Sequence, residues 1–235
     1  MTNSEFSNEF DILYNNIMSN QAPGLDAYEK SVFLTKAQED IVLAYYTGRN
    51  ESGDYFEGSE EVRQYLYTLV LDAKMEPYTK TEQNKDDYPI GISDDSTFWF
   101  YDNDYLFILS EHIKTDSDKK IKVIPVTADE FLKIENNPFR GPSKSRVLRL
   151  DISNPTGGRV HELVTTETIK KYIARVLRKP TPIIVGDLGG LSIDKVSKYD
   201  GDDAISCELP DSLHRKIIDR AVLLAKTSFV SNPGQ

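Results

Sequence analysis

The stretch Val123–Ser153, VIPVTADEFLKIENNPFRGPSKSRVLRLDIS, is the most informative part of the sequence, because it divides into strand, helix, turn and strand with almost no residue spare. Thr127 and Glu130 have the spacing of a capping box, which predicts a short helix that begins after Thr127. The apolar residues of that helix are Phe131, Leu132 and Ile134.

The turn that follows this helix is expected to be rigid. Asn137-Pro138 ends the helix, and Arg140-Gly141-Pro142 turns the chain toward a strand from Val147 to Ile152. Two prolines so close together restrict the unfolded chain. We therefore predict a partly buried corner in which Phe139 packs into the core.

Helical periodicity marks the chain before Pro77. The segment from Tyr28 is predicted to open with a short turn of helix. It continues as a second helix that is capped by Thr35, which forms a capping box with Gln38, and that ends at Gly48. A third helix is predicted from about Ser59 to Lys74. The apolar face of the first helix consists of Phe6, Phe10, Leu13, Tyr14 and Ile17.

The pattern changes to period two after the connector Pro77–Asp95. Ile169–Lys179 fits both a strand and a helix, whereas a final helix near Pro210 is clearly indicated. The other expected strands are Phe98–Phe100, Tyr105–Ile113, Val147–Ile152 and Val160–Val164, the last two joined by a hairpin-type turn at residues 154–158.

These elements predict an α+β fold, in which N-terminal helices and a C-terminal helix form a helical layer and a central antiparallel module is rich in β-strands. The expected organisation is a helical region at 1–80, a β-rich region with one short helix at 81–208, a helix packing back at 209–230, and a free or partner-bound tail at 231–235.

Composition excludes several classes of protein. With 39% hydrophobic and 28% charged residues in 235, the chain is globular and long enough to bury a core. Its single cysteine, Cys207, excludes an intrachain disulfide and is expected to be a buried structural thiol. Residues 1–5 lack the start of a signal peptide, and no apolar run approaches the ~20 residues needed to cross a bilayer. We expect a soluble protein without membrane contact.

Charge is distributed unevenly along the chain. Net charge is −15 over residues 1–137, +7 over 138–180 and −2 over 181–235, which together give −10. Three interpretations are open: scattered solvated charges, a basic face that meets the acidic face of an identical neighbour, or contact with nucleic acid. The candidate subunit-interface residues are Arg140, Lys144, Arg146, Arg149, Lys170, Lys171, Arg175 and Arg178.

Catalytic and cofactor motifs are missing from the sequence. The three histidines form no HExxH, no GxSxG is present, and Gly186–Gly190 lacks the lysine and serine of a phosphate loop. We expect no enzyme activity, metal or cofactor. The one hint of an enzyme is a set of aspartates beside aromatic residues, a pairing that glycosidases use; it consists of Asp94, Asp95, Asp102 and Asp104.

The segment containing NPFRGP (Asn137–Pro142) resembles a region of small virion proteins of crAss-like tailed bacteriophages, which form rings in the neck and tail below the portal. The similarity continues through Tyr172–Val185 (YIARVLRKPTPIIV) and Cys207–Ala225 (CELPDSLHRKIIDRAVLLA), and Tyr28–Tyr46 (YEKSVFLTKAQEDIVLAYY) also fits. The resemblance implies that Ile169–Lys179 is a strand.

The resemblance also implies a structural role and no reaction. The expected protein forms a ring of about twelve copies at the portal–tail junction, links head to tail and lines the path of exiting DNA without binding it specifically. Its partners would be the portal protein and adjacent tail ring proteins, in a virion assembled in the bacterial cytoplasm. The alternatives are an intracellular scaffold or regulatory binding module, and a carbohydrate-active enzyme built on the Asp94–Asp104 cluster.

Overall fold

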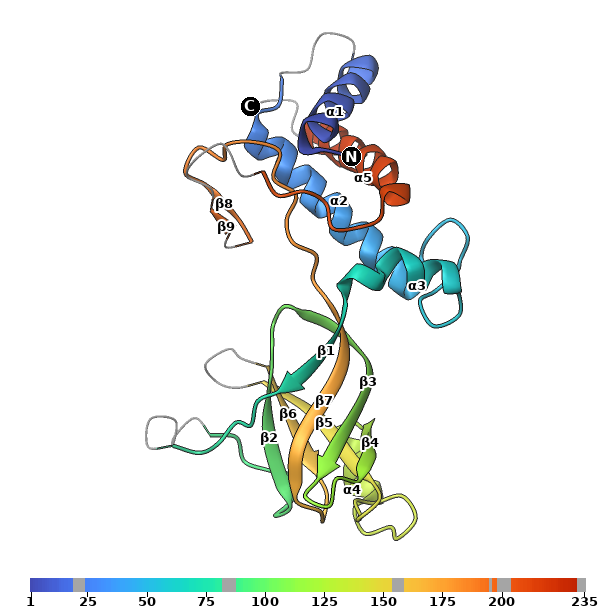
Figure 1. Ribbon diagram of the computed structural model, residues 1–235, viewed down its shortest axis with the longest axis vertical. Helices are drawn as coiled ribbons and strands as arrows, with labels where there is room; N and C mark the ends of the chain where they lie inside the picture. Colours follow the sequence, from blue (N-terminus) through green and yellow to red (C-terminus); the bar gives the residue numbers. More distant parts are fainter. Residues whose placement is uncertain (19–23, 82–87, 154–158, 195, 198–203, 232–235) are drawn as a thin grey trace. The chain divides into compact units, whose positions relative to one another are not determined.

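The computed structural model describes residues 1–18, 24–81, 88–153, 159–194, 196–197 and 204–231. The chain forms two compact units. The helical unit consists of residues 1–69 and 179–235, and the β unit consists of residues 70–178. Helices and strands are thus largely segregated, as Figure 1 shows, and the predicted α+β class is confirmed.

The helical unit is built around three long helices, α1, α2 and α5, with α5 packed against both α1 and α2 (Figure 1). Their apolar faces form its core, in which Phe6, Phe10, Leu34 and Ile217 are buried. The helices are α1 (Asn3–Met18), α2 (Ala27–Thr47), α3 (Glu60–Leu66) and α5 (Asp211–Ser231), with the 3-10 turn η1 (Tyr67–Leu69) and the short strands β8 (Ser192–Ile193) and β9 (Val196–Ser197).

Helix α2 is continuous, and the predicted start at Thr35 is wrong. The helix is capped by Asp26, whose side chain accepts a hydrogen bond from Glu29 N at 2.7 Å. Thr35 lies buried in mid-helix, where its hydroxyl accepts from Ile183 N at 3.2 Å, and Gln38 Nε2 donates to Thr181 O at 2.8 Å. Thr35 and Gln38, which have the spacing of a capping box, therefore form hydrogen bonds with backbone groups of a segment about 145 residues away in the chain.

The end of α2 agrees with the sequence, but the third helix does not. Gly48 adopts φ 75° and its N–H bonds to Ala44 O, as predicted for a C-terminal glycine. Helix α3 stops at Leu66, and the chain is already a strand at Val70. The predicted extension of this helix to Lys74 is wrong, because Val70–Met75 forms a full ladder with a strand nearly 100 residues away along the chain.

The β unit is a seven-stranded sheet in the order β1-β7-β3-β4-β5-β6-β2. All neighbouring strands are antiparallel except β4 and β5, which are parallel because helix α4 (Ala128–Ile134) carries the chain back between them. The strands are β1 (Val70–Met75), β2 (Ser96–Tyr101), β3 (Tyr105–Thr115), β4 (Lys120–Pro125), β5 (Val147–Ser153), β6 (Arg159–Val164) and β7 (Ile169–Arg178).

The sheet curls until its two end strands meet. Just past β1, Phe100 N donates to Glu76 O and Tyr78 N donates to Phe98 O, both at 2.8 Å, which joins this segment to β2. The result is a closed barrel (Figure 1). Its interior holds a large apolar cluster that includes Trp99 and Tyr172. Closure removes the exposed sheet edges.

Most of the predicted strands are confirmed. Segment 169–178 is strand β7, and β5 pairs with β6 as an antiparallel hairpin, although its turn at residues 154–158 lies outside the described residues, as does most of the tail predicted at 231–235. Within the described parts of the chain, no helix is long and apolar enough to span a membrane.

The turn after α4 is closed by hydrogen bonds, but Phe139 is not in the core. Thr127 caps α4 by accepting from Glu130 N at 3.2 Å. Asn137 Oδ1 then accepts from the N–H groups of Phe139 at 2.8 Å and Arg140 at 3.2 Å. These bonds direct Phe139 outward, where its exposed fraction is 82%. The prediction that Phe139 is packed is therefore wrong.

Candidate assembly surfaces

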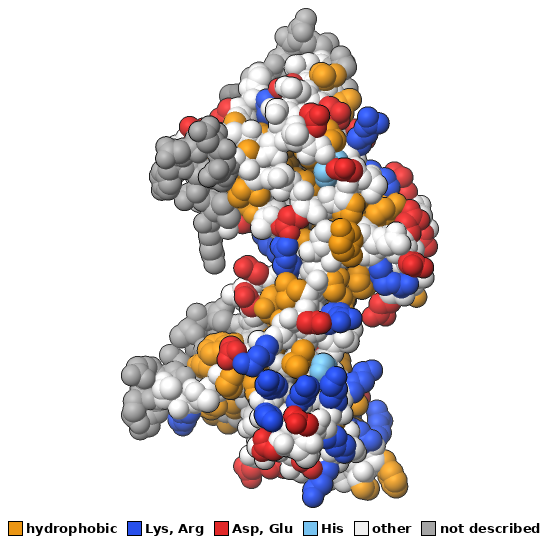
Figure 2. All heavy atoms as spheres, viewed as in Figure 1, with side chains coloured by type: hydrophobic (Ala, Val, Ile, Leu, Met, Phe, Trp, Pro, Cys, Tyr) orange, Lys and Arg blue, Asp and Glu red, His pale blue; other side chains and the backbone are white. Residues whose placement is uncertain are grey.

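A basic surface covers the outer side of strands β1, β7, β3 and β4. Side chains alternate along each strand between the barrel interior and this outer side, so the outward positions share a face. The only described carboxylate at an outward position of these four strands is Asp72. We call this surface the basic strand face; it consists of Lys74, His112, Lys114, Lys120, Lys122, Lys171 and Arg175 (Figure 2).

Three lysines lie in one row across the basic strand face. Lys114 on β3 is registered opposite Lys120 on β4 and opposite Lys171 on β7. Adjacent strands are ~4.8 Å apart, so the three ammonium groups repel one another. None of the three forms an ion pair with any residue that the structure describes. The row is therefore suited to an acidic partner from outside the chain.

His112 lies beside this row of lysines, and their positive charge affects its pKa. It is registered opposite Lys122 on β4. Partial burial lowers the pKa of His112, and the positive charges of Lys120 and Lys114 lower it further. Unlike the three lysines, Arg175 has a partner within the chain. Its guanidinium forms a bidentate pair with Asp72 at 2.7 and 3.1 Å.

The structure brings only some of the predicted interface residues together. Lys171 and Arg175 lie on the basic strand face, and Lys170 pairs with Asp118 at 3.5 Å at the turn beyond β3. Arg178 ends β7 and is half-buried. The connection between α4 and β5 holds the remaining three loop cations, which are Arg140, Lys144 and Arg146.

Arg149 lies inside the barrel and is not a surface residue. Its Nε donates to Glu111 Oε1 at 3.0 Å, and both side chains are buried. Sequence reasoning chose Arg149 for its charge alone and missed Lys74, Lys114, Lys120 and Lys122. The alternation of lysine and apolar residues in KIKV (residues 120–123) is the sequence signal that could have predicted that Lys120 and Lys122 point outward.

The pair between Arg149 and Glu111 belongs to a buried polar network. Tyr172 OH donates to Glu111 Oε2 at 2.5 Å. Since that bond uses the only hydroxyl proton, His161 Nδ1 must donate to Tyr172 at 3.0 Å. His161 Nε2 faces Arg149 NH1 at 3.5 Å and lies 3.3 Å from Asp151 Oδ1, whose side chain is 68% exposed. A neutral ring can accept from the guanidinium there, whereas a protonated ring would have this exposed carboxylate to set against the charge of Arg149.

Electrostatics in this network agree with the geometry. Burial lowers the pKa of His161 to about 3, and the nearby charge of Arg149 adds to that effect. Burial, together with the carboxylate of Glu111, raises the pKa of Tyr172. His161 and Tyr172 are thereby held in their neutral forms beside the buried ion pair of Arg149 and Glu111.

We expect the β unit to lose stability as pH falls from 6.5 toward 3. The unfolded chain binds a proton at His161 near pH 6.5, whereas the folded chain resists protonation down to about pH 3. Between pH 6.5 and 4.5 this difference amounts to about 2 kcal/mol, because the slope reaches ~1.4 kcal/mol per pH unit only once the unfolded imidazole is mostly protonated. Urea unfolding followed by fluorescence of Trp99, the only tryptophan, measures it.

His161→Gln should flatten this pH profile by about that amount, because glutamine keeps a donor toward Tyr172 but does not titrate. His112→Gln is the matched control on the exterior of the barrel and should flatten the profile less, because its ring is only partly buried. Equal slopes for wild type and His161→Gln would show that acid sensitivity arises elsewhere.

The helical unit carries most of the negative charge of the chain. It contains 11 basic and 20 acidic residues, a net charge of −9, whereas the β unit contains 17 and 18, a net charge of −1. Residues 51–61 concentrate this charge in the loop before α3 and its first turn, without one lysine or arginine. We call them the acidic segment; its exposed carboxylates are Glu51, Asp54, Glu57, Glu60 and Glu61.

The acidic segment is held in a fixed conformation. Phe56 is buried and its ring lies 6.0 Å from that of Tyr46 on α2. Gly48 packs so closely that an added Cβ would lie 3.2 Å from Gly53 O. Among the described residues, none forms an ion pair with the five carboxylates. The segment is thus an ordered, unneutralised acidic surface.

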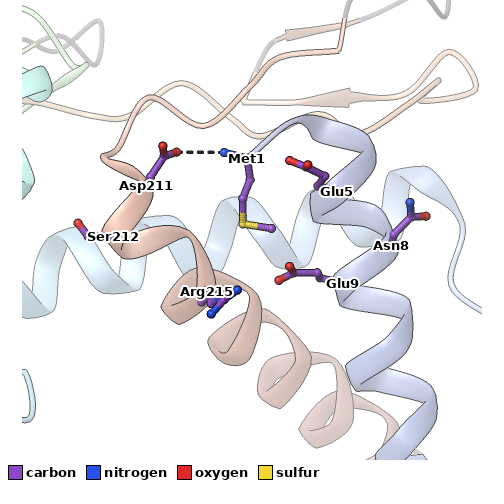
Figure 3. A pocket seen from close by; sticks show the side chains of 7 residues that line it. All are labelled: Met1, Glu5, Asn8, Glu9, Asp211, Ser212 and Arg215. Atoms are coloured by element: carbon purple, nitrogen blue, oxygen red, sulfur yellow. Dashed lines mark hydrogen bonds and ion pairs between the residues drawn. The ribbon is translucent and has the colours of Figure 1, made fainter.

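A hollow lies between the start of α1 and the start of α5 (Figure 3). Glu5 and Glu9 line it from α1 and Arg215 from α5, while Asp211 is bound to the amino group of Met1 at 3.0 Å. The described residues that line the hollow are three carboxylates, an arginine, an asparagine, a serine and Met1, and they form no arrangement typical of catalysis.

The residues that hinted at an enzyme are not brought together. Asp94 and Asp95 precede β2, while Asp102 and Asp104 follow it, so about 20 Å of strand separates the pairs at ~3.3 Å per residue. Glycosidase carboxylates lie within ~10 Å of each other. Among the residues described, no group of three or more metal-binding side chains is found either.

The glycine-rich segment Gly186–Gly190 leads into the two-residue strand β8 and not into a helix. It therefore lacks the helix N-terminus on which a phosphate loop depends. Cys207 donates to Gln38 Oε1 at 3.2 Å, and burial raises the pKa of its thiol to about 11. A protonated thiol is a poor nucleophile, which fits the predicted structural role.

Comparison with known proteins identifies the family of the chain. A family model described as phage tail ring protein 3/4 matches residues 1–235. The chain belongs to this family. It is 39% identical over 244 residues to "Ring protein 3" of Bacteroides phage crAss001, with 99% of each chain covered. It is also 35% identical over 237 residues to "Ring protein 4/5" of that phage, covering 97% of this chain and 94% of the relative.

Membership in the ring-protein family confirms the resemblance carried by the NPFRGP segment. This ring protein is a structural component of a phage tail. The two surfaces described above therefore belong to a protein whose relatives are named ring proteins.

Proposed function

We propose that this ring protein forms a closed ring of about twelve copies at the portal–tail junction of the virion, where it links the head to the tail. The observation that carries the proposal is end-to-end similarity to two ring proteins of one phage. A ring requires each copy to offer two different surfaces, because contact between unlike surfaces closes by rotation. The basic strand face and the acidic segment supply two such surfaces.

The partners in this proposal are further copies of the chain, the portal protein and the adjacent tail ring proteins. The ring lines the path of genomic DNA, which passes without specific binding. A net charge of −10 supports this part, because an acidic protein repels the phosphate backbone. Copies assemble in the host cytoplasm before they become part of the virion.

Two measurements test the proposed function. Native mass spectrometry of the purified protein should show one closed oligomer near twelve copies. Peptide identification in purified virions, followed by cryo-electron microscopy of the neck, should place that oligomer below the portal. Absence of the protein from virions, or an open filament with no defined copy number, would contradict the proposal.

A further inference from the structure

The basic strand face has a feature that its own chain does not explain. Lys114, Lys120 and Lys171 stand side by side on three adjacent strands, where like charges destabilise a sheet. The described part of the chain offers them no carboxylate. A surface that retains this repulsion is stabilised when an acidic partner covers it.

The acidic segment has the opposite property. Its carboxylates are exposed and unneutralised on an ordered loop, which Phe56 anchors by burial against α2. An ordered surface loses little conformational entropy on docking. The segment also presents Tyr55 with an exposed fraction of 54%, a residue type that is enriched at interface centres.

We propose that the acidic segment of one copy docks on the basic strand face of the next copy in the ring. The occupant of the face is thus a second copy of this chain, and the inference rests on the proposed function. Charge complementarity supports it, since the two surfaces have opposite sign, and neither the row of Lys114, Lys120 and Lys171 nor the carboxylates of the acidic segment form an ion pair with a described residue. Contact between unlike surfaces is also the type that closes a ring.

The experiment uses two reversals of charge in the full-length chain. Lys114→Glu with Lys171→Glu reverses the face, and Glu57→Lys with Glu60→Lys reverses the segment. Lys133→Glu with Lys80→Glu is the matched control, because both residues are exposed and lie outside the four strands. Sedimentation velocity at several concentrations, in 0.1 M and 1 M salt, measures assembly, and thermal unfolding confirms that each variant is folded.

Each reversal alone should weaken assembly by at least about tenfold, while the control leaves it unchanged. An equimolar mixture of the two reversed proteins should assemble again, because an acidic face then meets a basic segment and a basic face meets an acidic segment. A chain with all four substitutions should also assemble alone. Wild-type assembly should weaken in 1 M salt, where the Debye length falls to ~3 Å from ~10 Å at 0.1 M.

Several results would overturn the inference. The first is a wild type that stays monomeric at high concentration and low salt. The second is assembly that is indifferent to either reversal. The third is a mixture that fails to recover, which would show that the two surfaces bind different partners. Retention of wild type on DNA, abolished by reversal of the face with oligomer size unchanged, would assign the face to nucleic acid.

Failure of this inference can be distinguished from failure of the proposed function. A ring found in virions whose assembly ignores both reversals rejects the docking contact and leaves the ring function standing. A protein absent from virions rejects the ring function, whatever the reversals do in solution.

Discussion

Arg149→Met should lower the free energy of unfolding of the β unit by about 3–5 kcal/mol. Removing one partner of a buried ion pair leaves the other charge uncompensated in a medium of low polarity. Here the guanidinium is the counterion of Glu111 and also faces His161 inside the barrel. Urea unfolding followed by Trp99 fluorescence measures the loss at a concentration too low for assembly.

Arg175→Met is the matched control for this experiment. It removes the same group from the exposed pair with Asp72, and exposed pairs contribute ~1 kcal/mol or less. Arg149→Met with Glu111→Leu should recover much of the loss, because no buried charge then lacks a partner. If Arg149→Met costs no more than Arg175→Met, the network is not a determinant of barrel stability.

Phe131→Ala should destabilise the protein by about 3–5 kcal/mol, whereas Phe139→Ala should change stability by less than ~0.5 kcal/mol. The two residues are eight positions apart in the same helix and turn. Phe131 is fully buried against Leu148 and Val164, whereas Phe139 is 82% exposed. Chemical denaturation of both variants compares one substitution in two environments.

The comparison also tests how the turn is built. A loss above about 2 kcal/mol for Phe139→Ala would mean that its ring packs in solution, contrary to the geometry set by Asn137. If stability is unchanged, an assembly defect in Phe139→Ala would show that the phenyl side chain of Phe139 contacts another protein. Leu132 lies on α4, the helix before this turn, and has an exposed fraction of 62%. It offers a second site for that test.

Local signals in the sequence predicted the elements whose causes are local. Thr127 caps α4, and Gly48 ends α2 with a left-handed conformation, because each effect involves backbone within four residues. The same kind of signal failed at Thr35, since its hydroxyl and the amide of Gln38 bind backbone near residue 183. A capping pattern and a long-range contact use the same side chains, and sequence spacing does not distinguish them.

The strand at Val70–Met75 shows the same limit. Val70 continues the helical spacing of the preceding residues, yet it pairs with Leu177 in the barrel. Ladder hydrogen bonds and burial of Ala73 and Met75 outweigh a helical preference of a few tenths of a kcal/mol per residue. The sequence pattern therefore predicts the change from helix to strand after Lys74, whereas the strand already begins at Val70.

The α+β class, the alternation of most strands, the position of the NPFRGP turn and membership in the ring-protein family follow from local sequence patterns. The order of the strands, the parallel pair β4–β5, the burial of Arg149 and the gathering of Lys74, Lys114, Lys120 and Lys171 on one face come from contacts across the fold. A period of two assigns side chains only to the two sides of their own strand. Which side becomes the interior, and which strands become neighbours, depends on contacts between residues far apart in the chain.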